Sequence, residues 1–370
     1  MKSNQSLSTI ALQKFAKNFW GVFSFGYIVL MCLLAIFAYV LAPDDSENAN
    51  QMHLSIHSKP PGFTVKMLAL PIEEKQPRSI KNYFFGHTHQ ITEIPINEYT
   101  FTQNSIQYTE FSETDGLNLQ KEILFQNIPG FSSAKEMEKE LISTKTFYLG
   151  TDKYGRDLLS RMLVGSRVSL SIGFVAVFIS VIVGLFFGAL GGYYGGKVDA
   201  LVMWLVNVIW SIPTLLLVIA ITLALGKGFW QVFVAVGLTM WVEVARVVRG
   251  QIISVKQMQY VTAARALGFS DFRIIWNHII PNIMAPVIVI SAANFASAIL
   301  VESGLSFLGL GAQPPIPSWG GMIKDHYNYI ILGKPYLALV PGMAIMLITL
   351  AFMMTGNALR DALDVKQYKN

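Results

Sequence analysis

Long apolar stretches separated by polar connections dominate the pattern of the chain. A helix needs roughly 20 apolar residues to cross a bilayer core about 30 Å thick, and six stretches reach or approach that length. They lie at 19–41, 168–192, 199–225, 229–248, 286–310 and 336–358. The first follows a polar segment, 1–18, and lacks a small-residue cleavage site before Pro43, so we interpret it as a retained membrane helix rather than a signal peptide. The pattern predicts an all-α polytopic membrane protein with six transmembrane helices.

One long polar region, 43–146, interrupts this pattern between the first and second spans. Short runs of apolar and β-branched residues at 63–70 and 91–96 indicate strands, because prolines and glycines bound them. A helix is expected at 133–142, where Ser133 and a glutamate three residues later have the spacing of a capping box. The region predicts a small β-rich or α+β domain inserted into the membrane body.

Composition separates the same two parts. The chain is 53% hydrophobic and only 14% charged, whereas about 25% of residues are charged in soluble domains. The insert carries a formal net charge of −5 and the remainder +10, so the sequence pI of about 9.1 reflects a basic membrane rim and does not indicate nucleic-acid binding. The single cysteine, Cys32, excludes an intrachain disulfide framework and a cysteine metal site.

The distribution of basic residues predicts the orientation of the spans. Lys2, Lys14 and Lys17 precede the first span, and the positive-inside rule therefore places the N-terminus in the cytoplasm. Six spans return the C-terminus to the same side and leave the 43–146 insert outside. Basic residues at 153–167 oppose the rule. Apolar residues recur there at helical spacing, so we interpret the stretch as an amphipathic helix in the outer interface, with its arginines at headgroup level.

A glycine-rich segment at 191–198 has the spacing G-x-x-x-x-G-K of a phosphate-binding loop. Val198 stands where such a loop needs a hydroxyl group for magnesium, and the segment links two spans rather than a strand and a helix. We therefore interpret it as a tight glycine turn with interfacial Tyr193 and Tyr194. No serine, histidine and acid can be assembled at one depth of the membrane, so the sequence predicts that the chain is not an enzyme.

Four of the six histidines, His53, His57, His87 and His89, lie in the insert. His87 and His89 would face the same way on a strand. No carboxylate or cysteine stands beside them at familiar ligand spacing, so we interpret them as surface or partly buried polar residues and predict no metal site.

Two carboxylates fall inside apolar stretches, where an ionisable group is costly and usually faces a cavity or a partner. Glu302 is the clearer case and is a candidate for the translocation path; the alternative is a hydrogen-bonded structural carboxylate near the outer end of its helix. Glu243 is close enough in sequence to Arg246 to form an ion pair one helical turn apart.

The most informative segment is the basic connection at 250–285. Its sequence predicts a helix of small residues, a glycine turn at Gly268, a second helix capped by Ser270, and a stop at Pro281. Ala263 and Ala264 leave the first helix nearly bare, so another protein would be able to approach its backbone closely. A generic amphipathic hairpin in the membrane interface is the alternative.

This segment resembles the cytoplasmic coupling loop of ABC importer permeases, whose pattern is E-A-A, three residues, glycine, nine residues, and a histidine shortly before a proline. The matching residues are Ala263, Ala264, Gly268, His278 and Pro281, and Thr262 stands where glutamate is commonest. Further matches resemble the C-type permease of dipeptide and oligopeptide importers. They lie at 149–161, 302–311, 314–320 and 357–364, within a permease core at 147–370.

The resemblance implies a type I ABC importer subunit in a bacterial inner membrane. Its expected partners are a second homologous permease, two cytoplasmic ATPases that hold ATP and magnesium, an extracytoplasmic solute-binding protein, a peptide substrate and the lipid bilayer. No cofactor is expected in this chain. Uptake of nickel complexes or peptide antibiotics is the alternative within the family. Two other classes stay open: a self-contained secondary transporter, and a membrane-anchored sensor or assembly protein that works through the insert.

Overall fold

The computed structural model describes residues 7–71, 80–87, 91–112, 120–125, 134–226 and 228–363. These residues form two compact units. The first, here called the membrane unit, comprises Met1–Cys32, Val168–Gln313 and Gly342–Asn370, and the second, here called the insert unit, comprises Leu33–Arg167 and Pro314–Pro341. The helix α6 (Leu158–Tyr194) belongs to both.

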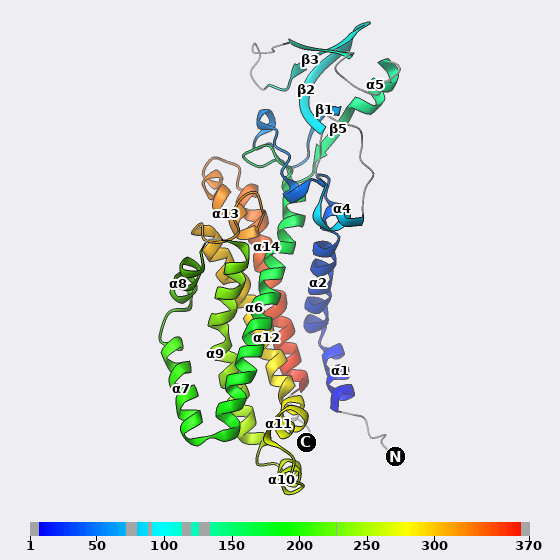
Figure 1. Cartoon of the computed structure of the whole chain (residues 1–370). Coiled ribbons are helices and arrows are strands. Elements are labelled where there is room, and N and C mark those ends of the chain that lie inside the picture. The colour runs from blue at the N-terminus through cyan, green and yellow to red at the C-terminus, as the bar shows by residue number, and fades with distance from the viewer. Residues whose placement is uncertain are drawn as a thin grey trace, which may run out of the picture. The chain divides into compact units, whose positions relative to one another are not determined.

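Five unbroken helices among the described residues are long and apolar enough to cross a membrane (Figure 1). They are α2 (Phe19–Ile36), α6, α9 (Phe229–Val255), α12 (Ile280–Phe307) and α14 (Tyr336–Leu363). The stretch at 199–225, predicted as one span, is instead two helices, α7 (Gly196–Trp210) and α8 (Thr214–Leu225), bent by 92°. Pro213 explains the break, because proline lacks an N–H and disfavours helical geometry in the residue before it.

The remaining helices are short. They are α1 (Leu7–Lys17), α3 (Ala38–Leu41), α4 (Ile80–Phe85), α5 (Ala134–Leu141), α10 (Gln259–Ala266), α11 (Asp271–Arg273) and α13 (Trp319–His326), with the 3₁₀ turns η1 (Glu47–Ala49), η2 (Leu54–Ile56) and η5 (Tyr327–Ile330) and the π-helical η4 (Ile274–Ile279).

Helices α6 and α9 approach each other closely in the membrane unit. Gly184, Gly188 and Gly192 recur every four residues along α6. A Cβ atom at Gly188 would lie 2.7 Å from the carbonyl oxygen of Ala245. One at Gly184 would lie 2.5 Å from Val244 Cβ. Small residues at this spacing let the backbones of two membrane helices approach closely. The resulting dispersion contacts stabilise the pair, because the hydrophobic effect does not drive helices together in lipid.

A five-stranded antiparallel sheet with strand order β4-β3-β2-β1-β5 forms the main part of the insert unit. Its strands are β1 (Phe63–Pro71), β2 (Ile91–Phe101), β3 (Ser105–Glu110), β4 (Gln120–Leu124) and β5 (Ile142–Phe147). Leu68, Ile96 and Ile106 are buried on one face together with Leu141 of α5. The predictions of strands at 63–70 and 91–96 and of the closing helix are confirmed; Ser133 lies outside the described residues.

Asp152 lies at the centre of a buried ion-pair cluster below the sheet. Its carboxylate accepts a hydrogen bond from Arg156 Nε at 2.6 Å and lies 3.7 Å from Arg161 Nε. Arg156 also donates to Asn50 Oδ1 at 2.9 Å, and all three charged side chains are buried. The prediction of arginines at headgroup level is therefore wrong for Arg156 and Arg161. Residues 158–167 form the first turns of α6, and the Asp152 carboxylate holds both guanidinium groups inside the protein.

The residues around Asp152 fasten the start of α6 to residues 53–59. Thr151 Oγ1 donates to the Ile56 carbonyl oxygen at 2.5 Å and accepts the Lys59 N–H at 2.8 Å. Gly155 has a φ of +73°, and a Cβ atom there would lie 1.8 Å from the His53 carbonyl oxygen. The motif at 149–161 therefore has a structural role, because Thr151, Asp152 and Gly155 hold the start of α6 against residues 53–59 and the buried arginines.

The loop at 314–320 packs into the same unit. Trp319 is fully buried, and its Nε1 donates to the Met162 carbonyl oxygen at 3.1 Å. His326 at the end of α13 donates from Nδ1 to the Met322 carbonyl oxygen at 2.7 Å, and burial lowers the pKa of His326, which favours the neutral ring. The compact unit is thus wider than the predicted insert at 43–146.

Candidate functional site

The glycine turn of the 250–285 segment is a Schellman motif at the end of α10. The Phe269 N–H donates to the Ala264 carbonyl oxygen at 3.2 Å, and the Gly268 N–H donates to that of Arg265 at 3.0 Å. Gly268 has a φ of +77°, the left-handed conformation that this motif requires and that residues with a Cβ rarely adopt. The predicted turn at Gly268 is confirmed.

The second arm of the hairpin begins as predicted and ends differently. Ser270 Oγ accepts the Arg273 N–H at 3.4 Å and caps α11. The predicted stop at Pro281 is wrong, because the helix runs unbroken from Asp271 to Phe307. The π-helical turn η4 immediately precedes Pro281, and the Asn282 side chain donates to the His278 carbonyl oxygen at 2.6 Å, so a carbonyl near the proline keeps a partner.

The inner face of the hairpin packs on the membrane unit. Val261 and Ala264 of α10 and three isoleucines of η4 are buried against α9 and α12; the isoleucines are Ile274, Ile275 and Ile279. Ala263 and Ala266 are exposed. Ala264, which we expected to be available to another protein, therefore belongs to the core, and only part of the small-residue surface is free for contact.

The outer face carries large apolar side chains that the sequence reasoning missed. Leu267 is 74% exposed, Phe272 71% and Trp276 47%, and the rings of the last two lie 6.0 Å apart. Exposed apolar residues grouped in this way are typical of protein or membrane contact surfaces. Their signal in the sequence was weak because Phe272 and Trp276, four residues apart on one helical face, resemble core residues when burial is unknown.

Polar and aromatic contacts fix the shape of the hairpin. The His278 ring stacks on Phe269 at a centroid distance of 5.7 Å, and the Arg273 guanidinium lies 4.4 Å from the same ring. Tyr193 at the end of α6 donates to Asp271 Oδ1 at 2.6 Å and accepts from Arg265 at 3.4 Å. His278 is therefore a packing residue, and Tyr193 joins both arms of the hairpin to α6. Thr262 Oγ1 donates to the Met258 carbonyl oxygen of its own helix at 3.4 Å.

The two carboxylates inside the spans differ in environment. Glu302 is fully buried, and the Ser306 hydroxyl donates to Glu302 Oε1 at 2.6 Å. Glu243 is exposed in the single chain. The ion pair predicted between Glu243 and Arg246 is not formed; the Arg246 guanidinium instead lies 3.7 Å from the ring of Trp210. Glu302 thus has the contacts of a structural carboxylate, and its path role stays a prediction.

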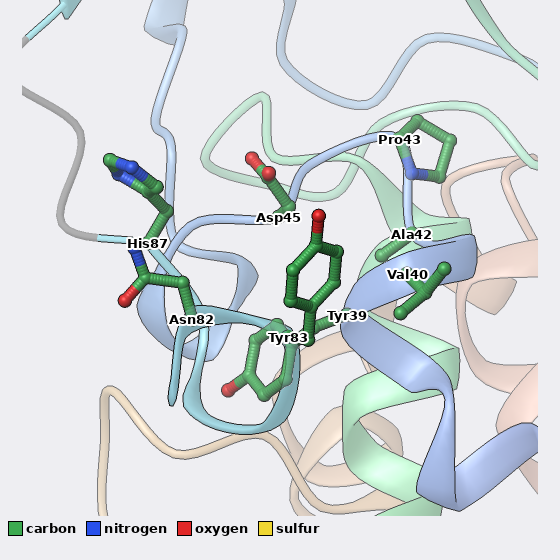
Figure 2. Close-up of a pocket in the computed structure, with 8 residues that line it drawn as sticks. All are labelled: Tyr39, Val40, Ala42, Pro43, Asp45, Asn82, Tyr83 and His87. Carbon is green, nitrogen blue, oxygen red and sulfur yellow. The ribbon is translucent and has the colours of Figure 1, made fainter. Parts of the chain in front are cut away.

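A cavity of about 180 Å³ lies in the insert unit between α3 and α4 (Figure 2). Tyr39, Asp45, Asn82 and His87 supply its polar lining, and the His87 N–H donates to the Asp45 carbonyl oxygen at 2.8 Å. Among the residues with described positions, no three histidine, cysteine or carboxylate side chains are grouped to hold a metal ion. His89 lies outside those residues.

Comparison with known families gives two matches. Residues 180–367 match the family described as "Binding-protein-dependent transport system inner membrane component", and residues 6–61 match the "N-terminal TM domain of oligopeptide transport permease C". The hairpin lies in the first match. Residues 62–179, which contain the described strands of the sheet, lie between the two.

Individual relatives match over most of their length. The dipeptide transport system permease protein DppC of Alkalihalophilus pseudofirmus is 41% identical over 59% of this chain and 72% of its own. The oligopeptide transport system permease protein OppC of Escherichia coli K12 is 43% identical over 64% of this chain and 76% of its own. A solved structure of the MetNI methionine ABC transporter, inward facing, covers 54% of this chain and 95% of its own at 17% identity and a TM-score of 0.45.

Proposed function

Because the chain belongs to the family of binding-protein-dependent transport system inner membrane components, we propose that it is the permease subunit of an ATP-driven importer of di- and oligopeptides. It is a multi-span transport component of a bacterial inner membrane and not an enzyme. The observation that carries the peptide class is the identity of 41% and 43% to permeases named for dipeptide and oligopeptide transport.

The hairpin of α10 and α11 is the surface that we assign to the ATPase. It offers exposed Ala263 and Ala266 for close approach, and exposed Leu267 and Phe272 for burial in a partner. Thr262 stands in place of the family's usual glutamate and offers no charge to the ATPase at that position. Three residues support this surface from within. Gly268 forms the turn, His278 stacks on Phe269, and Pro281 lies in the continuous helix that follows.

The complete importer in this proposal contains a second homologous permease, two ATPases and an extracytoplasmic binding protein. The ATPases hold ATP and magnesium in the cytoplasm, where the hairpin and both termini of this chain also lie, and the insert lies outside. Closure of the ATPase dimer moves the hairpin and opens the path outward; hydrolysis and reopening release the peptide inward. The ligand that copurifies with the binding protein distinguishes peptides from nickel complexes or peptide antibiotics.

The coupling role is tested by the double substitution Leu267→Ser and Phe272→Ser in the reconstituted complex. Burying each side chain in the ATPase would contribute about 1.5–3 kcal/mol, so losing both weakens the contact severely. We expect peptide uptake to fall at least about tenfold while the ATPase subunits still hydrolyse ATP. Uptake and ATP hydrolysis are measured in the same proteoliposomes.

Leu12→Ser is the matched control, because Leu12 on α1 is 69% exposed and lies outside the hairpin. We expect it to leave the ratio of peptide transported to ATP hydrolysed unchanged. Wild-type coupling in the double variant would remove the role assigned to this surface.

A further inference from the structure

A second cavity, of about 170 Å³, lies in the membrane unit at the break between α7 and α8. Its volume is several times the ~30 Å³ that one water molecule takes in the liquid. Ile209, Trp210, Ile212 and Thr214 line it from the two half-helices; Thr239 and Glu243 line it from α9, and Asn294, Ser297 and Val301 from α12. The 92° bend between α7 and α8 lies beside this space, because residues on both sides of the bend line it.

Asn294 lines this cavity and carries a buried donor without a partner among the described residues. The side chain is 1% exposed, and its Nδ2 has no hydrogen-bond partner among the described residues. A buried amide without a partner costs free energy, and such groups are rare in folded proteins. The Asn294 side chain therefore has room for an acceptor that the described residues do not supply.

Glu243 presents a carboxylate at the same cavity and the same depth. It is close to the middle of α9 (Phe229–Val255), as Asn294 is close to the middle of α12 (Ile280–Phe307). An exposed carboxylate at mid-membrane does not face lipid without a large cost, so it faces water, substrate or a partner. Arg246 is one turn away, but its guanidinium lies over Trp210 and makes no ion pair with Glu243.

The cavity thus combines a negative acceptor, a neutral donor and a broken helix at mid-membrane. Transporters use broken helices of this kind to build substrate sites near the bilayer midplane. We propose that this cavity is a substrate subsite of the translocation path that takes the amino-terminal end of a peptide: Glu243 accepts hydrogen bonds from the α-ammonium group, and Asn294 Nδ2 donates to the adjoining carbonyl oxygen. This inference rests on the proposed transport of peptides.

The subsite differs in place and chemistry from the earlier candidate, Glu302. That carboxylate is fully buried and accepts from Ser306, whereas Ser297 and Val301 of the same helix line the cavity. The translocation path therefore follows the face of α12 that carries Asn294, Ser297 and Val301, spaced three and four residues apart.

Thiol labelling of the complete complex in nanodiscs tests the subsite. Cys32→Ser removes the only cysteine, and Ser297→Cys places one at an exposed position of the cavity lining. We expect a water-soluble thiol reagent to label Cys at 297, and a dipeptide with a free amino group to slow labelling at concentrations at least about tenfold lower than its N-acetylated form. No labelling, or equal protection by both peptides, would overturn the subsite.

Two substitutions in this background separate substrate contacts from structural roles. Glu243→Gln is expected to remove the preference for the free amine. Asn294→Leu is expected to weaken protection by both peptides without lowering thermal stability, since it removes a buried donor that has no partner. Protection unchanged by Glu243→Gln, as expected if Glu243 pairs only with the second permease, would also overturn the proposal.

Thr355→Val is the matched control. The Thr355 hydroxyl on α14 is buried without a partner among the described residues and does not line the cavity. It should leave peptide protection and uptake unchanged. Failure of the Cys32→Ser complex to take up any peptide, with its ATPase active, would overturn the proposed function itself; uptake without selective protection would overturn only the subsite.

Discussion

At the scale of single residues, the Asp152 carboxylate compensates the charges of two neighbouring arginines inside the protein. It is fully buried, and it is the counter-charge for two guanidinium groups, Arg156 and Arg161, that are themselves buried. Removing one partner from a buried ion pair typically costs about 3–5 kcal/mol, because the remaining charge stays out of water. The stability of the insert unit therefore depends on this carboxylate.

We expect Asp152→Asn to lower the Tm of the purified protein by on the order of 10 °C, because two buried cations lose their counter-charge. Lys153→Gln is the control next to it in sequence: Lys153 pairs with Asp325 at 3.1 Å, but both side chains are partly exposed, so that pair contributes about 0–1 kcal/mol. Thermal unfolding in detergent measures both variants. An equal effect of the two substitutions would contradict the account of the cluster.

The sequence identifies many of these residues but not their partners. Helical spacing correctly grouped the apolar residues near Arg161. Spacing carries no information about partners more than a hundred positions away: the Asn48 carbonyl oxygen accepts from Arg161, and Asn50 Oδ1 accepts from Arg156. The same limit explains Ala264: small residues alternate between core and surface on α10, and only packing shows which face is which.

At the scale of elements, the hairpin depends on the left-handed residue that ends α10. No atom of the described residues lies within 4 Å of a Cβ atom built on Gly268, so a substitution there is limited by backbone conformation and not by crowding. A branched residue at positive φ costs about 1–2 kcal/mol, whereas asparagine tolerates this conformation.

We therefore expect Gly268→Val to accelerate amide hydrogen exchange across 259–273 by roughly 5- to 30-fold and to uncouple ATP hydrolysis from uptake. Gly268→Asn, which tolerates the left-handed conformation, should change exchange less than about threefold and keep transport. Hydrogen exchange with mass spectrometry gives the first readout. Identical exchange in both variants would show that the turn does not need the left-handed conformation.

Prolines mark where sequence reasoning about elements succeeds and fails. Pro213 lies in the break between α7 and α8, while Pro281, Pro286 and Pro341 lie within continuous helices. In a soluble helix each would be a breaker, but neighbouring helices and π-helical turns restore the lost hydrogen bonds in membrane proteins. The existence of the spans follows from hydrophobic length, and their breaks depend on packing that the pattern does not contain.

At the scale of the whole molecule, the paired strand ends mark where the sheet begins and ends. Phe63 and Phe147 are paired residues at the ends of β1 and β5. Residues 44–59 bond to 151–161, as in the hydrogen bond from the Asp44 N–H to Ser160 Oγ at 2.8 Å, and they also contact the region between the paired ends, where Ile56 packs with Val65. The sequence placed the insert boundary at the polar switch near residue 43, whereas the paired strand ends place the boundary of the sheet at 63 and 147.

We expect that joining Phe63 to Phe147 through two glycines, with 64–146 removed, leaves a permease whose membrane unit still folds but which has lost contact with the binding protein or the second permease. The reason is the acidity of the removed region and its proposed position outside the membrane. Residues 39–59 lose their contacts with α4 and β1 in this variant. Capture of binding protein and copurification of the complex are measured. Asp152→Asn, which keeps the sheet, controls for simple loss of stability; unchanged capture and assembly in the excised chain would contradict this role.

The unbroken helix from Asp271 to Phe307 also has a mechanical consequence. Asn294 lies 23 residues beyond Asp271, about 35 Å along one axis at 1.5 Å per residue. One helix therefore joins the hairpin to the mid-membrane cavity, and no loop lies between them that would take up a rotation of the hairpin. A rotation of the hairpin about the helix axis would move Asn294 away from the cavity wall and bring its neighbours there. The side chains that a passing peptide contacts would then depend on the rotation of this helix.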